Sequence, residues 1–318
     1  MPDPPAPRAQ VGGGFPTFTR IAVFVATPWE LQAVVKAGHV VQRMRLAGYR
    51  AVVLREGPVS WTVVQTGVGP VRAHQAAMAA LRDLRVEAVL STGVAASLRR
   101  ASVGSVVIGT GVMSLDAGRD NAAQPEREST VPTGRGLTAN LTPASDTPMW
   151  SCDTNWSGWL SEQGRRFAAQ DTSARETVCL EGPFLSAAQI IGLASEKQAL
   201  AGHYADAVGL DMESAALAQV AARWRLPFGV ARTVSDSVDD SMPMDFNPFL
   251  EPRERLGAMA REAALCVVSP ERWRALLRFS RQSRHAGAQL TAFLRQVFRA
   301  AAAADPSKGS SGPRRVAS

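Results

Sequence analysis

The chain alternates short apolar segments with segments of helical periodicity, and this alternation constrains its fold more than any other feature. Short apolar runs bounded by turn residues are typical of buried strands, and amphipathic segments between them predict helices. Strands and helices in this order form a mostly parallel sheet covered on both faces. Strands are expected at residues 21–26, 51–54, 61–65, 88–91, 105–110, 177–181, 207–209 and 228–234. Helices are expected at residues 29–36, 71–84, 195–202, 212–224, 253–268 and 272–299.

Several segments lie outside this pattern. Residues 1–18 are expected to be a flexible leader and residues 301–318 a disordered tail, because both are rich in Pro, Gly or Ser. Residues 19–300 between them are expected to form one domain. Within it, residues 116–154 lack apolar periodicity, which predicts a flexible insertion, and residues 253–300 are expected to form a helical extension. The predicted fold class is α/β: a single-domain twisted mixed sheet flanked by helices.

The positive charge of the chain is concentrated near its C-terminal end. The formal net charge is +7, and residues 272–304 hold seven arginines and no acidic residue. Apolar residues fall among these arginines at helical spacing, which predicts a basic amphipathic helix. Its apolar stripe either packs on the domain or contacts an anionic membrane surface through residues 272–299. No apolar run approaches the roughly 20 residues that span a bilayer. Residues 1–14 lack the pattern of a secretory signal, so the expected location is cytoplasmic, with peripheral membrane association as a hypothesis.

Charged residues follow the ends of three predicted strands. Glu30 comes shortly after the first strand, Glu213 lies between a short strand and an Ala-rich helix, and Arg232 and Asp236 end a buried strand. Ligands of open α/β sheets bind beyond the carboxyl ends of the strands. Carboxylates placed there can act as general acids or bases, so these four residues are the candidates for chemistry.

Four motifs add a resemblance. The segments "VATPWELQAV", "QTGVGPVRAHQAA", "LSTGVAASL" and "DMESAALAQVAARWRLPFGVARTVSDS" occur in this order between Ile21 and Asp240. Together they resemble the nucleoside phosphorylase and nucleosidase superfamily, and particularly its methylthioadenosine/S-adenosylhomocysteine nucleosidase branch. The spacing from Glu213 through Arg232 to Asp236 matches that family without a gap.

The resemblance implies cleavage of the N-glycosidic bond of a purine nucleoside, with adenine as the expected base. It implies that Glu30 positions the attacking water with the help of Arg232, and that Asp236 donates a proton to N7 of the base. It also implies that Glu213 and Met212 hold the ribose. Further substrate contacts are expected from Ser91, Gly93, Phe184, Leu185 and Ser235. A homodimer is expected by the same analogy, with no metal and no organic cofactor.

Each of these residues also has a simpler interpretation. Glu30 in the first turn of a helix is favoured by the helix dipole alone. Ser235 and Asp236 could cap a helix, and Arg232 could be an ion-pair partner of Asp211. Phe184 could be an ordinary core residue.

The nucleophile and the 5′ substituent of the nucleoside stay open. Phosphorylases of this superfamily carry an arginine where this chain has Ser91, which favours water over phosphate, although Arg72 or Arg99 could supply a substitute charge for phosphate as co-substrate. The C-terminal extension resembles hopanoid-associated phosphorylases, so phosphorolysis of an adenosylated hopanoid is one alternative. A catalytically inactive nucleoside- or nucleic-acid-binding protein is another, although no specific nucleic acid partner is expected.

Overall fold

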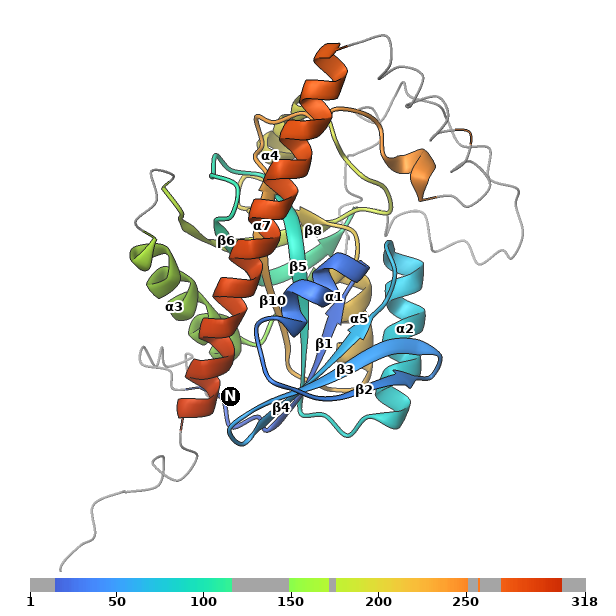
Figure 1. The fold of residues 1–318 in the computed structure, drawn as a ribbon, viewed down its shortest axis with the longest axis vertical. Coiled ribbons are helices and arrows are strands. Elements are labelled where there is room, and N and C mark those ends of the chain that lie inside the picture. Colours follow the sequence, from blue (N-terminus) through green and yellow to red (C-terminus); the bar gives the residue numbers. More distant parts are fainter. Residues whose placement is uncertain (1–14, 116–148, 172–175, 251–256, 258–269, 305–318) are drawn as a thin grey trace, which may run out of the picture.

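The computed structural model describes residues 15–115, 149–171, 176–250, 257 and 270–304. Its strands form one mixed sheet with helices packed around it (Figure 1). The strands are β1 (Arg20–Val25), β2 (Val40–Leu46), β3 (Tyr49–Glu56), β4 (Val59–Gln65), β5 (Ala88–Ser97), β6 (Val106–Ser114), β7 (Met149–Ser151), β8 (Cys179–Ser186), β9 (Gly209–Asp211) and β10 (Phe228–Asp236). The helices are α1 (Pro28–Val35), α2 (Pro70–Asp83), α3 (Thr154–Gln170), α4 (Ala194–His203), α5 (Ser214–Arg223) and α7 (Pro270–Ala303), with a short 3₁₀ turn η2 (Asn247–Phe249).

Strand pairing closes one end of the sheet on itself. Following the pairs from β5 through β10, β6, β8 and β9 leads back to β5. From β5 the sheet continues through β1, β4 and β3 to β2. Strands β1, β5 and β10 run parallel to one another. Their carboxyl ends therefore lie at the same edge of the sheet, and the predicted α/β class with a mixed sheet is confirmed.

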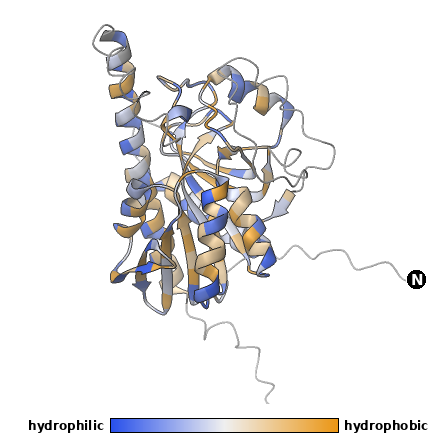
Figure 2. Cartoon of the chain, turned by 90° about the vertical axis from the view of Figure 1, so that its right-hand side faces the viewer, coloured by the Kyte–Doolittle hydropathy of each residue, from blue (hydrophilic) through white to orange (hydrophobic). Residues whose placement is uncertain are grey.

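Apolar burial holds α7 against the sheet through its second half. Figure 2 shows hydrophobic residues concentrated in the strands, whereas polar and apolar residues mix along α7. From Ala286 to Ala301 this helix buries a stripe that joins the same core as β1, α1 and α3. The stripe comprises Ala286, Leu290, Phe293, Leu294, Val297, Phe298 and Ala301. Burial of each large apolar side chain contributes about 1.5–3 kcal/mol, so this half of α7 is integral to the domain.

The first half of α7, residues 270–285, is more exposed than the second half, residues 286–303. Trp273 and Leu277 are 54% and 40% exposed, and Phe279 stacks on Phe246 just before η2. The hypothesis that residues 272–299 form one membrane-contacting stripe is therefore wrong for the second half, whose apolar side is inside the core. In the part of the chain that the structure describes, no helix meets the length and apolarity needed to cross a membrane.

Several predicted boundaries need correction. The leader was expected to reach residue 18, but Phe15 and Phe18 pack edge-on against Trp159 and Trp156, which ties the chain to the core before β1 begins. The insertion was expected to reach residue 154, but β7 and the start of α3 lie within that range. Residues 301–303 continue α7 and are not part of a tail. The predicted helix at 253–268 lies, except for residue 257, outside the described residues.

A core truncation in α7 tests whether this helix is part of the domain. Phe298 is fully buried and its ring centroid lies 4.5 Å from that of Trp61. We expect Phe298→Ala to lower the free energy of unfolding by about 3–5 kcal/mol, because it leaves a cavity in the core. Leu277→Ala, on the exposed half of the same helix, should change it by about 0.5 kcal/mol or less. Urea unfolding of both variants measures the difference, and equal small effects would show that α7 is only loosely attached.

Candidate active site

Four buried charged side chains from three parts of the fold lie along the edge of the sheet where β5 and β10 end. Strand β1 leads into α1, which carries Glu30, and β9 leads into α5 with Glu213 at its N-cap. Strand β10 supplies Arg232 and, at its last residue, Asp236. All four of these side chains are buried. The parallel strands β1, β5 and β10 end at this edge, and the antiparallel pairing of β9 with the last residues of β5 brings Glu213 to the same edge.

Glu30 is fixed by hydrogen bonds to both of its carboxylate oxygens. Its Oε2 accepts from the backbone N and the hydroxyl of Thr27, both at 2.8 Å, and the Thr27 hydroxyl in turn accepts from the Glu30 backbone N. This is a capping box at the start of α1. Its Oε1 accepts from the backbone N of Val94 at 3.0 Å. The simpler interpretation of Glu30, as a charge in the first turn of a helix, therefore agrees with its position in α1, but Oε1 is directed to β5.

Gly93 allows this close approach. Its φ is +145°, which side-chain-bearing residues rarely adopt. A Cβ at this position would overlap Glu30 Oε1 and lie 3.0 Å from Arg232 Nη1. Glu30, Gly93 and Arg232 are thus mutual neighbours, and the glycine is required by space as well as by conformation.

Arg232 is held by partners from β5, β9 and α5. Its Nη2 donates to the hydroxyls of Ser91 at 2.9 Å and Ser214 at 3.3 Å, and its Nη1 donates to Val94 O at 3.1 Å. Its Nε forms an ion pair with Asp211 Oδ2 at 2.8 Å. The interpretation of Arg232 as a partner of Asp211 is confirmed. The same guanidinium also reaches toward Glu213, whose Oε2 lies 4.0 Å from Nη2.

Glu213 lies where several influences on its ionisation compete. Burial, aided by the nearby Asp211 and Glu30 carboxylates, raises the pKa of its carboxyl to about 7 against the opposing effects of Arg232 and the backbone N of Gly69. The Gly69 N donates to its Oε1 at 2.8 Å. At neutral pH both protonation states of this side chain are accessible, so it can accept a hydrogen bond from a ligand hydroxyl or donate one to it at small cost.

Asp236 has a partner that sequence reasoning missed. The Nζ of Lys197, on α4, lies 2.5 Å from Asp236 Oδ2 and donates to Ser237 O at 2.7 Å. Ser235 Oγ lies 2.6 Å from Asp236 Oδ1. Strand β10 runs through to Asp236 with an irregularity after Val234, so the alternative that Ser235 and Asp236 cap a helix is wrong. A single lysine in an ordinary helical segment carries no motif that could have predicted this contact.

The remaining predicted contacts divide into two groups. Met212 is half-buried beside Glu213, and Ser91 joins the Arg232 cluster directly. Phe184 and Leu185, however, have no exposed surface, and the Phe184 ring packs against the backbone of Gly209 in the core. The structure leaves no face of Phe184 for a base to stack on. The packing of Phe184 therefore agrees with the simpler interpretation of this residue as part of the core.

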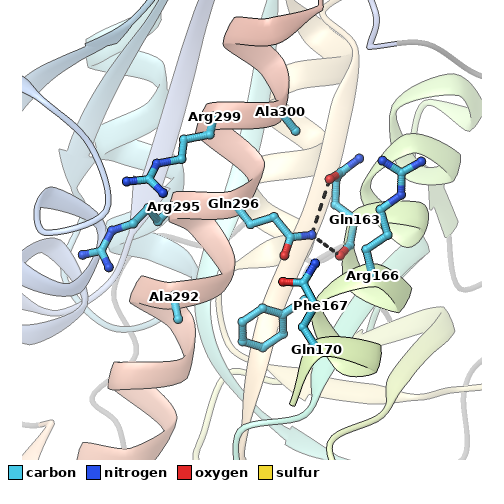
Figure 3. A pocket seen from close by; sticks show the side chains of 9 residues that line it. All are labelled: Gln163, Arg166, Phe167, Gln170, Ala292, Arg295, Gln296, Arg299 and Ala300. Atoms are coloured by element: carbon cyan, nitrogen blue, oxygen red, sulfur yellow. Dashed lines mark hydrogen bonds between the residues drawn. The ribbon is translucent and has the colours of Figure 1, made fainter. Parts of the chain in front are cut away.

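A hollow lies away from these carboxylates. A cavity of about 560 Å³ between α3 and α7 is lined by Gln163, Arg166, Phe167, Gln170, Ala292, Arg295, Gln296, Arg299 and Ala300. Figure 3 shows Arg295 and Arg299 extending from the side of α7 opposite to Gln163 and Arg166. Arg166 is also paired with Glu162. Because the guanidinium groups do not converge, this cavity lacks the features of an anion site. Among the described residues, no group of His, Cys, Asp or Glu side chains could hold a metal ion.

The family model of the phosphorylase superfamily matches residues 20–268. The chain belongs to this superfamily. The matched range contains every residue of the carboxylate cluster, from Glu30 in α1 to Asp236 in β10. The site geometry of this superfamily member can therefore be compared with that of its relatives.

Similar proteins are nucleosidases or a hydrolase by name. The 5′-methylthioadenosine/S-adenosylhomocysteine nucleosidase of Haemophilus ducreyi is 26% identical over 235 residues, which cover 73% of this chain and 90% of that protein. The solved enzyme of the same name from Neisseria meningitidis, in complex with methylthio-immucillin-A, matches with a TM-score of 0.60 at 20% identity and covers 88% of this chain and 99% of its own. The native futalosine hydrolase of Helicobacter pylori strain 26695 matches with a TM-score of 0.55 at 19% identity over 77% of this chain and 98% of its own. At these identities the solved structures show a shared fold.

The raised pKa of Glu213 predicts a pH-dependent cost to stability. In the folded protein Glu213 keeps its proton up to about pH 7, whereas an ordinary glutamate releases it near 4.5. The folded state therefore binds the extra proton in this interval, and stability falls as pH rises through it. We expect wild type to lose up to about 3 kcal/mol relative to Glu213→Gln between these pH values. Urea unfolding at several pH values measures this, with the exposed Glu181→Gln as control; a pH-independent difference between wild type and Glu213→Gln would contradict it.

Proposed function

We propose that this protein hydrolyses the N-glycosidic bond of a purine nucleoside, with adenine as the base. The observation that carries the proposal is the gathering of Glu30 and Glu213 about Arg232, with Gly93 leaving room for Glu30 and with Asp236 farther along the same strand as Arg232. Membership of the superfamily and the names of its relatives support the same reaction.

The proposed roles follow from the contacts. Departure of a purine base is eased by a proton at N7, and Asp236 is the carboxyl group that supplies it. Glu213 accepts from ribose hydroxyls while the Met212 thioether packs on the sugar. Glu30 is held rigidly by Thr27 and Val94, so its remaining lone pairs can orient a water molecule and take its proton without side-chain reorganisation. The positive charge of Arg232 offsets the repulsion that Glu30 exerts on Glu213.

The charge balance of the cluster favours water over phosphate. Three carboxylates, those of Glu30, Asp211 and Glu213, surround the single guanidinium of Arg232, which is already paired with Asp211. A phosphate dianion needs several cations or backbone N–H groups directed at it. Ser91 uses its hydroxyl within the cluster, and Arg72 donates to the carbonyl of Val68 in its own loop. A neutral water molecule is the nucleophile that this environment accommodates at least cost.

Base release is the direct test of this activity. We expect adenine to be released from methylthioadenosine and adenosylhomocysteine without phosphate, and to be detected by liquid chromatography. Asp236→Asn and Glu30→Gln should each lower kcat/KM by on the order of 10² to 10⁴, whereas Asp239→Asn, an exposed neighbour, should change it little. Strict dependence on phosphate would refute hydrolysis, and absence of release from any purine nucleoside would refute the reaction class.

A lipid-linked nucleoside is a second candidate substrate, favoured by the position of the first half of α7. Ala286 O accepts from Thr233 Oγ1 of β10, and the helix rises past the sheet from that point (Figure 1). The residues from 270 to 285 extend by about 24 Å at 1.5 Å per residue. This half exposes Trp273 and Leu277 among Arg274, Arg278, Arg281 and Arg284. A basic helix with an exposed tryptophan beside the site suits a substrate held in an anionic membrane.

Vesicle binding tests this second candidate. We expect the protein to sediment with phosphatidylserine vesicles at low salt and to be released at high salt, since surface attraction is screened within a Debye length. The double variant Trp273→Ala/Arg278→Glu should lose most of this binding and keep its activity on methylthioadenosine. A charge reversal at Arg299, on the other half of α7, serves as the control. Equal binding of all three proteins would exclude the first half of α7 as the contact.

A further inference from the structure

Lys197 is a buried cation in an unfavourable place. It lies in the first turn of α4 and its side chain is 0% exposed. Removing an ammonium group from water costs several kcal/mol, and the N-terminal end of a helix disfavours positive charge. Such a residue contributes little to stability even when it is paired. The presence of Lys197 beside Asp236 is therefore better explained by the chemistry of that carboxyl group than by stability.

The contacts of Lys197 point to Asp236. Two of its three N–H donors have acceptors, Asp236 Oδ2 at 2.5 Å and Ser237 O at 2.7 Å. Both acceptors lie at the end of β10, so the lysine ties the last residue of the strand to α4. Asp236 can therefore not rotate without breaking a charged hydrogen bond inside the protein. Its direction toward the edge of the sheet is fixed.

The other oxygen of Asp236 can hold or release a proton without moving heavy atoms. Ser235 Oγ lies 2.6 Å from Asp236 Oδ1 and 3.1 Å from Ala95 O. A hydroxyl has one hydrogen to donate. When Asp236 is ionised, the Ser235 hydroxyl donates its hydrogen to Oδ1. When Oδ1 carries a proton, the Oδ1 hydroxyl donates to Ser235 Oγ, and the Ser235 hydroxyl donates to Ala95 O. Both protonation states are thus fully hydrogen-bonded.

We propose that Lys197 is a positioning residue for the proton donor Asp236. This inference rests on the proposed function. As the base departs, the Asp236 O–H bond breaks, an N–H bond forms at N7, and the electron pair of the glycosidic bond passes to the purine. A carboxylate is left on Asp236, and the Lys197 ammonium stabilises this new charge. The stabilisation is present in the transition state and needs no reorganisation, which is the arrangement that accelerates a reaction most.

The test compares two leaving groups. A purine needs protonation to leave, whereas 4-nitrophenolate leaves without it. We expect Lys197→Met to lower kcat on methylthioadenosine by on the order of 10²-fold, with KM little changed. On 4-nitrophenyl 5-methylthio-β-ribofuranoside the same variant should stay within about threefold of wild type. Lys197→Arg, which keeps a cation, should recover part of the loss, and Lys36→Met, which removes an exposed lysine, serves as the control.

A double variant separates this role from a structural one. If Lys197 acts through Asp236, then Lys197→Met/Asp236→Asn should be no slower on methylthioadenosine than Asp236→Asn alone. This double variant also removes the unpaired carboxylate, so it tests the assignment even if Lys197→Met fails to fold, as thermal unfolding would show. Equal losses on both leaving groups, or additive losses in the double variant, would overturn the assignment. If Asp236→Asn slows base release and Lys197→Met does not, the assignment fails and the proposed function stands; no base release by wild type overturns both.

Discussion

The burial of one guanidinium group organises this site. Arg232 comes from the interior of β10, where an unpaired charge would cost several kcal/mol. Its partners come from other parts of the chain: Ser91 of β5 lies 141 positions away in the sequence, and Asp211 and Ser214 flank the start of α5. The guanidinium group of Arg232 has all of these partners only when β5, β9 and β10 have assembled. Correct assembly of the sheet and formation of the site are therefore the same event.

Simple and functional interpretations of a residue do not exclude each other here. Glu30 closes the capping box of α1 with one oxygen and contacts β5 with the other. The cap holds the carboxylate at a fixed angle, and Gly93 leaves room for it beside Arg232. Arg232 likewise satisfies Asp211 while it faces the site. Each structural contact removes rotational freedom from a side chain that chemistry needs in one orientation.

Sequence patterns predicted those parts of the fold and site that depend on local periodicity and motif order. Most strands, five of the six helices that the structure describes, and the gathering of Glu30, Glu213 and Arg232 fall in this class. Helix α3 was missed because its apolar side is formed by Trp156, Trp159 and Leu160 within a polar segment. Lys197 was missed because only tertiary packing places α4 against the end of β10. Phe184 was misjudged because burial against Gly209 cannot be seen in a motif.

The distribution of buried charge sets this edge of the sheet apart. In the residues that the structure describes, the buried ionisable side chains of Asp, Glu, Lys and Arg are Glu30, Lys197, Asp211, Glu213, Arg232 and Asp236, and all of them lie at this edge. Apolar residues of similar size would often stabilise a fold better than such pairs. Charges scattered through a core could each pair with one local partner, but charges gathered at one edge interact with one another. Burial is the largest cause of the raised pKa of Glu213, and the Asp211 and Glu30 carboxylates add to it. Perturbed carboxyl groups of this kind are typical of sites of proton transfer. The cost in stability is therefore concentrated where a substrate would bind.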